Sequence, residues 1–299
     1  MKGKVIVTGA AGFIGAHLTE QLTVAGYKVI AVVRPGSIHN SRVSRFPSDS
    51  VTVVPLEMSE IERLPDILEH RSGDEYISFY HLALHGGRND FNIQLANTLD
   101  SIKALETADK LNCRRFICTG SQAEYGVIRD RIITEDIEPN PFSAYGAAKV
   151  AICHLTRVRA VQLGIDWVWG RIFSVIGQYE PFGRMLPDLI KKLQNGESML
   201  LSSCEQNWDY LDAIDAAQAL IALAENGKSG EIYNIANGDY HKLKYFTELV
   251  RKHFAPEAVL SYGTDPDPFV SLQPSIEKIT EDTGWIPKIS FIESLKNYT

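Results

Sequence analysis

Short apolar runs rich in β-branched residues alternate with longer mixed segments over the first half of the chain. Continuously apolar runs are typical of strands buried on both faces of a parallel sheet, with helices as crossover connections. The predicted strands are residues 5–7, 29–33, 51–54, 77–82, 115–119 and 166–173, and the predicted helices are residues 16–25, 93–111 and 149–163. The alternation predicts an α/β fold, a Rossmann-like doubly wound parallel sheet.

The pattern changes after residue 173, where Gly, Pro and irregular polar stretches become more frequent. A helix over 212–225 and a strand over 230–236 are still predicted from their apolar positions. We therefore expect residues 1–173 to form the sheet domain, with part of 208–236 returning to it. Residues 174–299 should form mainly a smaller α/β C-terminal lobe.

Charge and cysteine content narrow the class of protein. The 299 residues include 30 Lys+Arg and 37 Asp+Glu, a net charge of −7 that does not favour nucleic-acid binding. Four scattered cysteines do not form a disulfide framework, and no run of about 18 apolar residues predicts a membrane span. His81 and His85 flank a predicted strand end, so we expect no metal site there. The prediction is a soluble, cytoplasmic protein.

A glycine-rich turn follows the first predicted strand. Gly9, Gly12 and Gly15 precede a predicted helix, an order in which glycines permit a tight turn and close approach of a pyrophosphate to the helix N-terminus. This context predicts a dinucleotide site in the sheet domain. The residues of this turn that we expect to bind the cofactor are Gly9, Ala11, Gly12, Phe13 and Ile14.

The end of the second predicted strand bears on the choice of nucleotide. NAD sites usually place an acidic residue there for the ribose 2′-hydroxyl, whereas an arginine accommodates a 2′-phosphate. Arg34 and Ser37 follow this strand, with no acidic residue between them. We expect NADP(H) to be preferred, with NAD(H) possible and a solvated Arg34 as the alternative interpretation.

Tyr145 and Lys149 lie four residues apart, which places them on one face of a helix. A nearby ammonium favours the phenolate, so such a tyrosine can exchange a proton with a substrate oxygen. The spacing alone is not distinctive, because Tyr240 and Lys244 share it. The first pair differs because Ser121, at the end of a predicted strand, offers a hydroxyl to the reacting oxygen.

Several segments carry a family resemblance over essentially the whole chain. They are residues 119–126 (TGSQAEYG), 133–149 (ITEDIEPNPFSAYGAAK), 81–83 (HLA), Asn97, 233–235 (YNI) and 283–287 (TGWIP). Together they resemble the extended short-chain dehydrogenase/reductases, in particular the NAD-dependent epimerase/dehydratase family acting on nucleotide sugars.

The resemblance implies a role for each matching residue. Tyr145 would be the acid/base, Lys149 would lower its pKa and hold the nicotinamide ribose, and Ser121 would orient the substrate oxygen. Asn97 would support this geometry. The remaining cofactor contacts implied are Glu57, Met58, Leu82, Ala83 and Asn97. A homodimer with a nucleotide-diphosphate sugar as substrate is also implied.

The chain departs from the family pattern at substrate-facing positions. Gln122 and Ala123 replace the Asp-Glu pair of the dehydratases, and Glu124 should face the other way, so a dehydratase is not expected. Ser174 stands where the family usually has an Asn that contacts the phosphates. Trp208 stands where the family has an Arg that often contacts the diphosphate, although Trp208 could also be a core residue. Arg184 or Arg171 could supply the missing charge, and Arg88 is a weaker candidate. The expected substrate-binding residues are Gln122, Ser174, Arg184 and Trp208.

Two reactions fit these features best. A 4-ketoreductase of a 4-keto-6-deoxy sugar would use NADPH, which the Arg34 interpretation favours. A 4-epimerase would keep NAD tightly bound. A third, remote alternative is a non-catalytic NADP-sensing protein, although such proteins usually lack the Tyr or the Lys.

Overall fold

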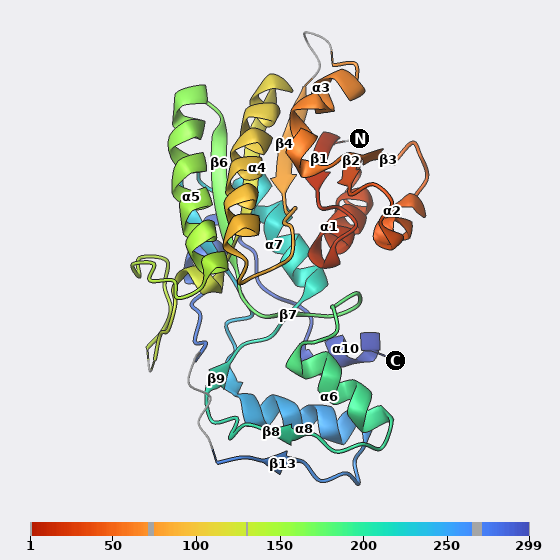
Figure 1. Ribbon diagram of the computed structural model, residues 1–299, viewed down its shortest axis with the longest axis vertical. Helices are drawn as coiled ribbons and strands as arrows, with labels where there is room; N and C mark the ends of the chain where they lie inside the picture. Colours follow the sequence, from red (N-terminus) through yellow and green to blue (C-terminus); the bar gives the residue numbers. More distant parts are fainter. Residues whose placement is uncertain (1, 71–74, 130, 265–270, 299) are drawn as a thin grey trace.

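A seven-stranded sheet forms the centre of the larger lobe in the computed structural model, which describes residues 2–70, 75–129, 131–264 and 271–298 (Figure 1). Every strand pair in this sheet is parallel. Across the sheet the strands are β3 (Val51–Pro55), β2 (Tyr27–Val33), β1 (Gly3–Thr8), β4 (Tyr76–His81), β5 (Cys113–Ser121), β6 (Asp166–Ile172) and β11 (Ile232–Ile235). This order, which reverses at β1, confirms the predicted Rossmann-like fold.

The central strands are apolar on both faces because each face has its own core. In β1, Val5 and Val7 enter the core on one face of the sheet, and Ile6 between them enters the core on the other. Successive side chains of a strand point to opposite faces, so a doubly covered strand must be apolar throughout. This is why the strands appear in the sequence as continuous apolar runs.

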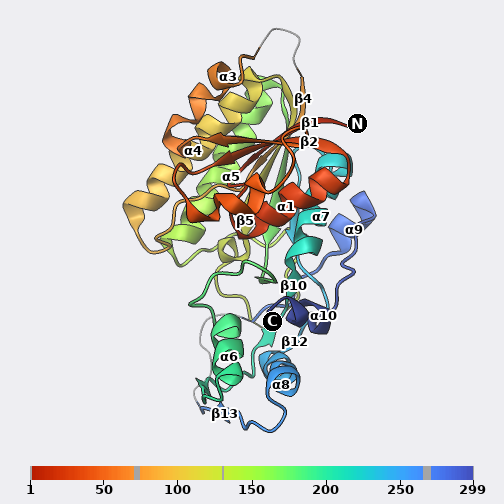
Figure 2. The same cartoon turned by 90° about the vertical axis from the view of Figure 1, so that its right-hand side faces the viewer.

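Helices cover both faces of the sheet (Figure 2). Helices α3, α4 and α5 lie on one face and α1, α2, α7 and α9 on the other. The chain returns to this lobe at α7 and β11, inside the range 208–236 that was expected to return, and again at α9, which the sequence analysis did not expect. The helices are α1 (Phe13–Val24), α2 (Ser41–Ser44), α3 (Leu64–Ile67), α4 (Phe91–Lys110), α5 (Ala144–Leu163), α7 (Ala213–Asn226) and α9 (Glu277–Thr283), with 3₁₀ turns at Ile38–Asn40, Met58–Arg63 and Gln122–Glu124.

Capping residues set the bounds of the helix that carries the candidate tyrosine. The Ser143 hydroxyl accepts a hydrogen bond from the Gly146 amide at 3.1 Å, and Gly164, with φ of 73°, ends the helix. Helix α5 therefore begins at Ala144, five residues before the predicted start. Tyr145 and Lys149 consequently both lie in its first two turns.

The smaller lobe packs two amphipathic helices against short strand pairs. Its core includes Leu189, Leu193, Tyr210, Phe246 and Val250. Its elements are β7 (Val175–Ile176), α6 (Met185–Gln194), β8 (Leu200–Leu201), β9 (Asn207–Trp208), β10 (Leu211–Asp212), β12 (His241–Lys242), α8 (Leu243–Phe254), β13 (Ser261–Tyr262), α10 (Phe291–Leu295) and a 3₁₀ turn at Lys296–Tyr298. Within the described part of the chain, no helix has both the length and the apolarity to cross a membrane.

Candidate active site

A cleft of about 640 Å³ lies between the two lobes at the carboxyl ends of the sheet strands. Its walls come from the segments that follow β1, β4, β5 and β6 and from α6, β8, β9 and the start of α8. Ligands of doubly wound sheets bind at this edge, where the strand order reverses. The cleft is thus the position expected for the reaction.

The glycine positions of the glycine-rich turn leave no room for a side chain. A Cβ on Gly9 would lie 2.9 Å from the backbone of Ala83, and one on Gly15 would lie 2.1 Å from the Gly9 carbonyl oxygen. Gly9 also has φ of 69°. Helix α1 begins directly after this turn, so its free N–H groups are available to a pyrophosphate. These residues fit the predicted dinucleotide.

A second cavity of about 180 Å³ continues from the glycine turn along the ends of β2 and β3. It has the position expected for the adenosine half of the cofactor. His39 and Asn40 also line it, although the sequence had not marked them. The expected cofactor residues that line this cavity are Gly9, Ala11, Gly12, Arg34, Ser37, Glu57, Met58, Leu82 and Ala83, while Phe13 and Ile14 line the larger cleft.

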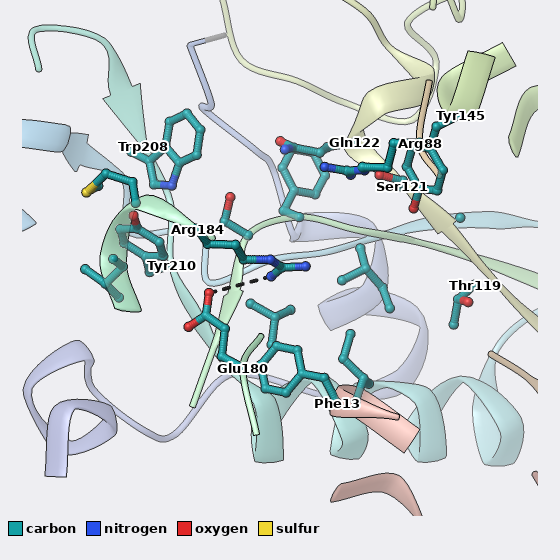
Figure 3. A pocket seen from close by; sticks show the side chains of 18 of the residues that line it. Phe13, Arg88, Thr119, Ser121, Gln122, Tyr145, Glu180, Arg184, Trp208 and Tyr210 are labelled. Carbon is teal, nitrogen blue, oxygen red and sulfur yellow. Dashed lines mark ion pairs between the residues drawn. The ribbon is translucent and has the colours of Figure 1, made fainter. Parts of the chain in front are cut away.

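Tyr145 and Ser121 lie together at one end of the cleft (Figure 3), and Lys149 also lines the cleft. The buried Lys149 donates a hydrogen bond from Nζ to the Thr119 carbonyl oxygen at 2.6 Å. Its Nζ lies 5.9 Å from the centre of the Tyr145 ring. The guanidinium of Arg88 lies 4.5 Å from the same ring, and the Arg88 carbonyl accepts a hydrogen bond from the Tyr145 amide. Two cations therefore flank the phenol.

Glu124 holds the turn that carries Ser121. Its buried carboxylate accepts hydrogen bonds from the Ser121 amide at 2.8 Å, from Trp169 Nε1 at 3.1 Å and from Arg171 Nε at 2.8 Å. The Arg171 side chain is thus buried and paired with Glu124. This corrects the expectation that Arg171 could bind the substrate phosphates. The Ser-x-x-Glu spacing at 121–124 is a capping-box pattern, so this support was visible in the sequence.

Asn97 and His81 lie beneath the cleft rather than on its wall. The Asn97 side chain accepts a hydrogen bond from the His85 amide at 2.9 Å and donates one to the His85 carbonyl at 3.2 Å, so it positions the loop after β4. The His81 ring nitrogens lie 2.8 Å from Thr8 Oγ1 and 3.0 Å from Ser101 Oγ. Burial, and the nearby Lys149, lower the pKa of His81 to about 3, which keeps the ring neutral.

The four expected substrate residues, Gln122, Ser174, Arg184 and Trp208, all line the cleft. Trp208 lies beside Tyr210 at the end opposite to Tyr145, with ring centres 6.2 Å apart (Figure 3). Trp208 Nε1 and Gln122 Oε1 are buried without a hydrogen-bond partner among the described residues. A polar atom in this condition is available to a ligand. The sequence did not mark Glu180, which pairs with Arg184 and follows no motif.

A tyrosine and a lysine one helical turn apart, facing a dinucleotide-binding turn, define a nicotinamide-dependent oxidoreductase of the short-chain dehydrogenase/reductase type. The model of the NAD-dependent epimerase/dehydratase family matches residues 5–236, and the chain belongs to this family. The members of this family that the chain matches are enzymes that act on nucleotide sugars, and they include epimerases, reductases and dehydratases.

Two curated relatives and one solved structure illustrate this range. The GDP-6-deoxy-D-mannose reductase of Pseudomonas aeruginosa is 25% identical, covering 99% of this chain and 96% of that protein. The UDP-glucose 4-epimerase of Corynebacterium glutamicum is 23% identical, covering 95% and 91%. The fold is similar to that of UDP-glucuronic acid 4-epimerase from Bacillus cereus in complex with NAD, with a TM-score of 0.85 and 22% identity over 99% of this chain and 97% of that one.

Proposed function

We propose that the protein is a 4-ketoreductase that uses NADPH to reduce a 4-keto-6-deoxy nucleotide-diphosphate sugar. The observation that carries the proposal is the linear arrangement of the cleft. Ser121 and Tyr145 lie at one end, Arg184 lies in the middle, and Trp208 lies at the other end (Figure 3). This order matches a sugar, a diphosphate and a base that stacks on an aromatic ring.

The side chains support proton transfer at the sugar. A bound nicotinamide supplies the hydride in such a reduction. Tyr145 donates its phenolic proton to the oxygen at sugar C4, and Ser121 donates a hydrogen bond that orients this oxygen. Lys149, held by the Thr119 carbonyl, stabilises the phenolate that remains. The presence of these three groups argues against a non-catalytic NADP sensor.

The choice of reaction rests on this chain's own residues, because reductases and epimerases both occur among its relatives. Gln122 and Ala123 lack the carboxylates for eliminating water, which argues against a dehydratase. Arg34 and Ser37 line the adenosine cavity where an NAD site would place an acid, which favours NADPH and therefore net reduction. The alternative is a 4-epimerase with tightly bound NAD.

The first experiment identifies the nucleotide carried by the purified protein. Acid releases it for chromatography, and stripped protein is then titrated with NADPH and NADH. Tighter binding of NADPH, with little nucleotide carried through purification, supports the reductase. Stoichiometric NAD would reject it in favour of the epimerase.

Tyr145→Phe tests the acid/base assignment. The variant should bind NADPH as the wild type does and lose turnover by roughly 10²–10⁴-fold, the usual contribution of general acid catalysis. Retained turnover would contradict the role of Tyr145.

We also propose that the protein is a homodimer. Helices α4 and α5 pack side by side (Figure 1), and apolar side chains on both remain exposed. Exposed apolar side chains that gather on two neighbouring helices favour an interaction site. The exposed residues on these helices are Phe91, Leu95, Leu99, Leu155, Val158 and Val161. A second copy of the chain, offering the same two helices, would cover them as a four-helix contact.

A further inference from the structure

An ion pair lies in the middle of the cleft, between the catalytic end and the aromatic end (Figure 3). Arg184 Nη1 lies 3.6 Å from Glu180 Oε1, a distance too long for a strong hydrogen bond. The Arg184 side chain is 49% exposed, whereas that of Glu180 is only 3% exposed. The arginine can therefore change partners at low cost, while the carboxylate stays in place.

The position of Glu180 is set by the C-terminal turn. The Tyr298 hydroxyl donates a hydrogen bond to Glu180 Oε2 and accepts one from the Gly177 amide at 2.9 Å. Arg184 has a second neighbour, because its guanidinium lies 5.9 Å from the ring of Phe13 at the start of α1. A substrate diphosphate that binds Arg184 would thus come close to a fixed, buried carboxylate.

We propose that Glu180 is a positioning residue that competes with the substrate's phosphates for Arg184 and takes up a proton when the phosphates bind. The proton comes from solvent and is bound by the Glu180 carboxylate, and no bond between heavier atoms forms or breaks. Two anions next to one arginine repel each other, and protonation of the carboxylate removes this repulsion. The inference rests on the proposed nucleotide-sugar substrate.

The surroundings of Glu180 make this proton uptake possible near neutral pH. Burial raises the pKa of Glu180 to about 7, although Tyr298 and Arg184 act in the opposite direction. Tyr210 also faces this carboxylate from the segment before β10. The outer cavity, which Glu180 borders on its other side, is lined by the titratable side chains of His39, Arg42, Tyr179, Lys191 and Tyr298. For each unit by which bound phosphates raise this pKa, the affinity at alkaline pH becomes about tenfold weaker than the affinity at acidic pH.

The test measures binding of a nucleotide sugar to the NADPH-loaded protein between about pH 6 and about pH 8.5, where neither the diphosphate nor the base of the probe changes its charge appreciably. UDP-glucose, GDP-mannose, CDP-glucose and dTDP-glucose are compared by calorimetry, and the tightest is used throughout. Wild-type affinity should fall about tenfold across this range. Calorimetry in buffers with different ionisation enthalpies should show proton uptake on binding.

Glu180→Gln should make affinity independent of pH and abolish the proton uptake. Tyr298→Phe removes a hydrogen bond that lowers the pKa of Glu180, so it should move the profile to higher pH. The matched control is Glu248→Gln, which breaks an acid–arginine pair with Arg251 on α8 and should leave the profile unchanged.

The two proposals fail in different ways. If a nucleotide sugar binds and Glu180→Gln keeps the wild-type pH dependence, the role of Glu180 is refuted and the substrate class stands. If none of the four probes binds, the proposed substrate class is refuted, and the role of Glu180 with it.

Discussion

Replacement of Glu124 by Gln should destabilise the larger lobe, because Glu124 is the buried counter-ion of Arg171. The side chains of the two residues are 0% and 2% exposed. The carboxylate also accepts hydrogen bonds from Trp169 and from the Ser121 amide. Glutamine has the same shape, so the change removes the charge and one acceptor without opening a cavity.

The size of the effect follows from the burial of Arg171. Removing one partner of a buried pair leaves an uncompensated charge and typically costs about 3–5 kcal/mol. The amide NH₂ of the new side chain would also face one of the groups that now donate a hydrogen bond to Glu124, so that two donors would point at each other. We therefore expect a loss of about 3–5 kcal/mol in the free energy of unfolding, together with lower turnover because Ser121 loses its anchor.

Urea unfolding followed by tryptophan fluorescence measures this loss, since Trp167 and Trp169 lie stacked in the same core. The matched control is Glu75→Gln. Glu75 pairs with Arg114 at 2.6 Å, but these side chains are 61% and 68% exposed, so the change should cost less than about 1 kcal/mol. A loss below about 1 kcal/mol for Glu124→Gln would refute the reasoning.

The remaining predictions concern the cofactor, pH and assembly. Arg34→Asp should lower the preference for NADPH over NADH by roughly 10- to 100-fold, the loss of a charged hydrogen bond; an unchanged ratio of dissociation constants would mean that Arg34 does not meet the 2′-phosphate. Because the pKa of Glu180 is raised from 4.5 to about 7, the folded protein holds a proton that the unfolded chain releases, so wild-type stability falls as pH rises through this window. Glu180→Gln should remove the part of this fall that Glu180 contributes and leave the part that comes from Asp209, whose pKa burial raises to about 6. Denaturation curves of both proteins at pH 5 and pH 8 check it. Leu99→Glu should halve the mass measured by sedimentation, whereas an unchanged mass would contradict the α4–α5 interface.

Features encoded over a few neighbouring residues could be predicted from the sequence. The alternation of apolar runs predicted the parallel sheet. The glycine turn predicted the dinucleotide site, and the Tyr145–Lys149 spacing together with Ser121 predicted the reacting end of the cleft. Each depends on local backbone geometry: strand periodicity, the steric demands of a tight turn, or one turn of a helix. The lining residues Gln122 and Trp208 were found because they stand at known positions of a family pattern.

The partners of charged residues depended on the tertiary structure. Arg171 and Arg184 were both named as candidates for the phosphates, yet the first is buried against Glu124 and the second is exposed in the cleft. The role that we propose for Glu180 depends on its hydrogen bond with Tyr298, which is far away in sequence. Periodicity shows which face of an element is buried, but the charge that meets a side chain across the core or the cleft depends on how distant segments pack. That packing decided which arginine remained available to a substrate.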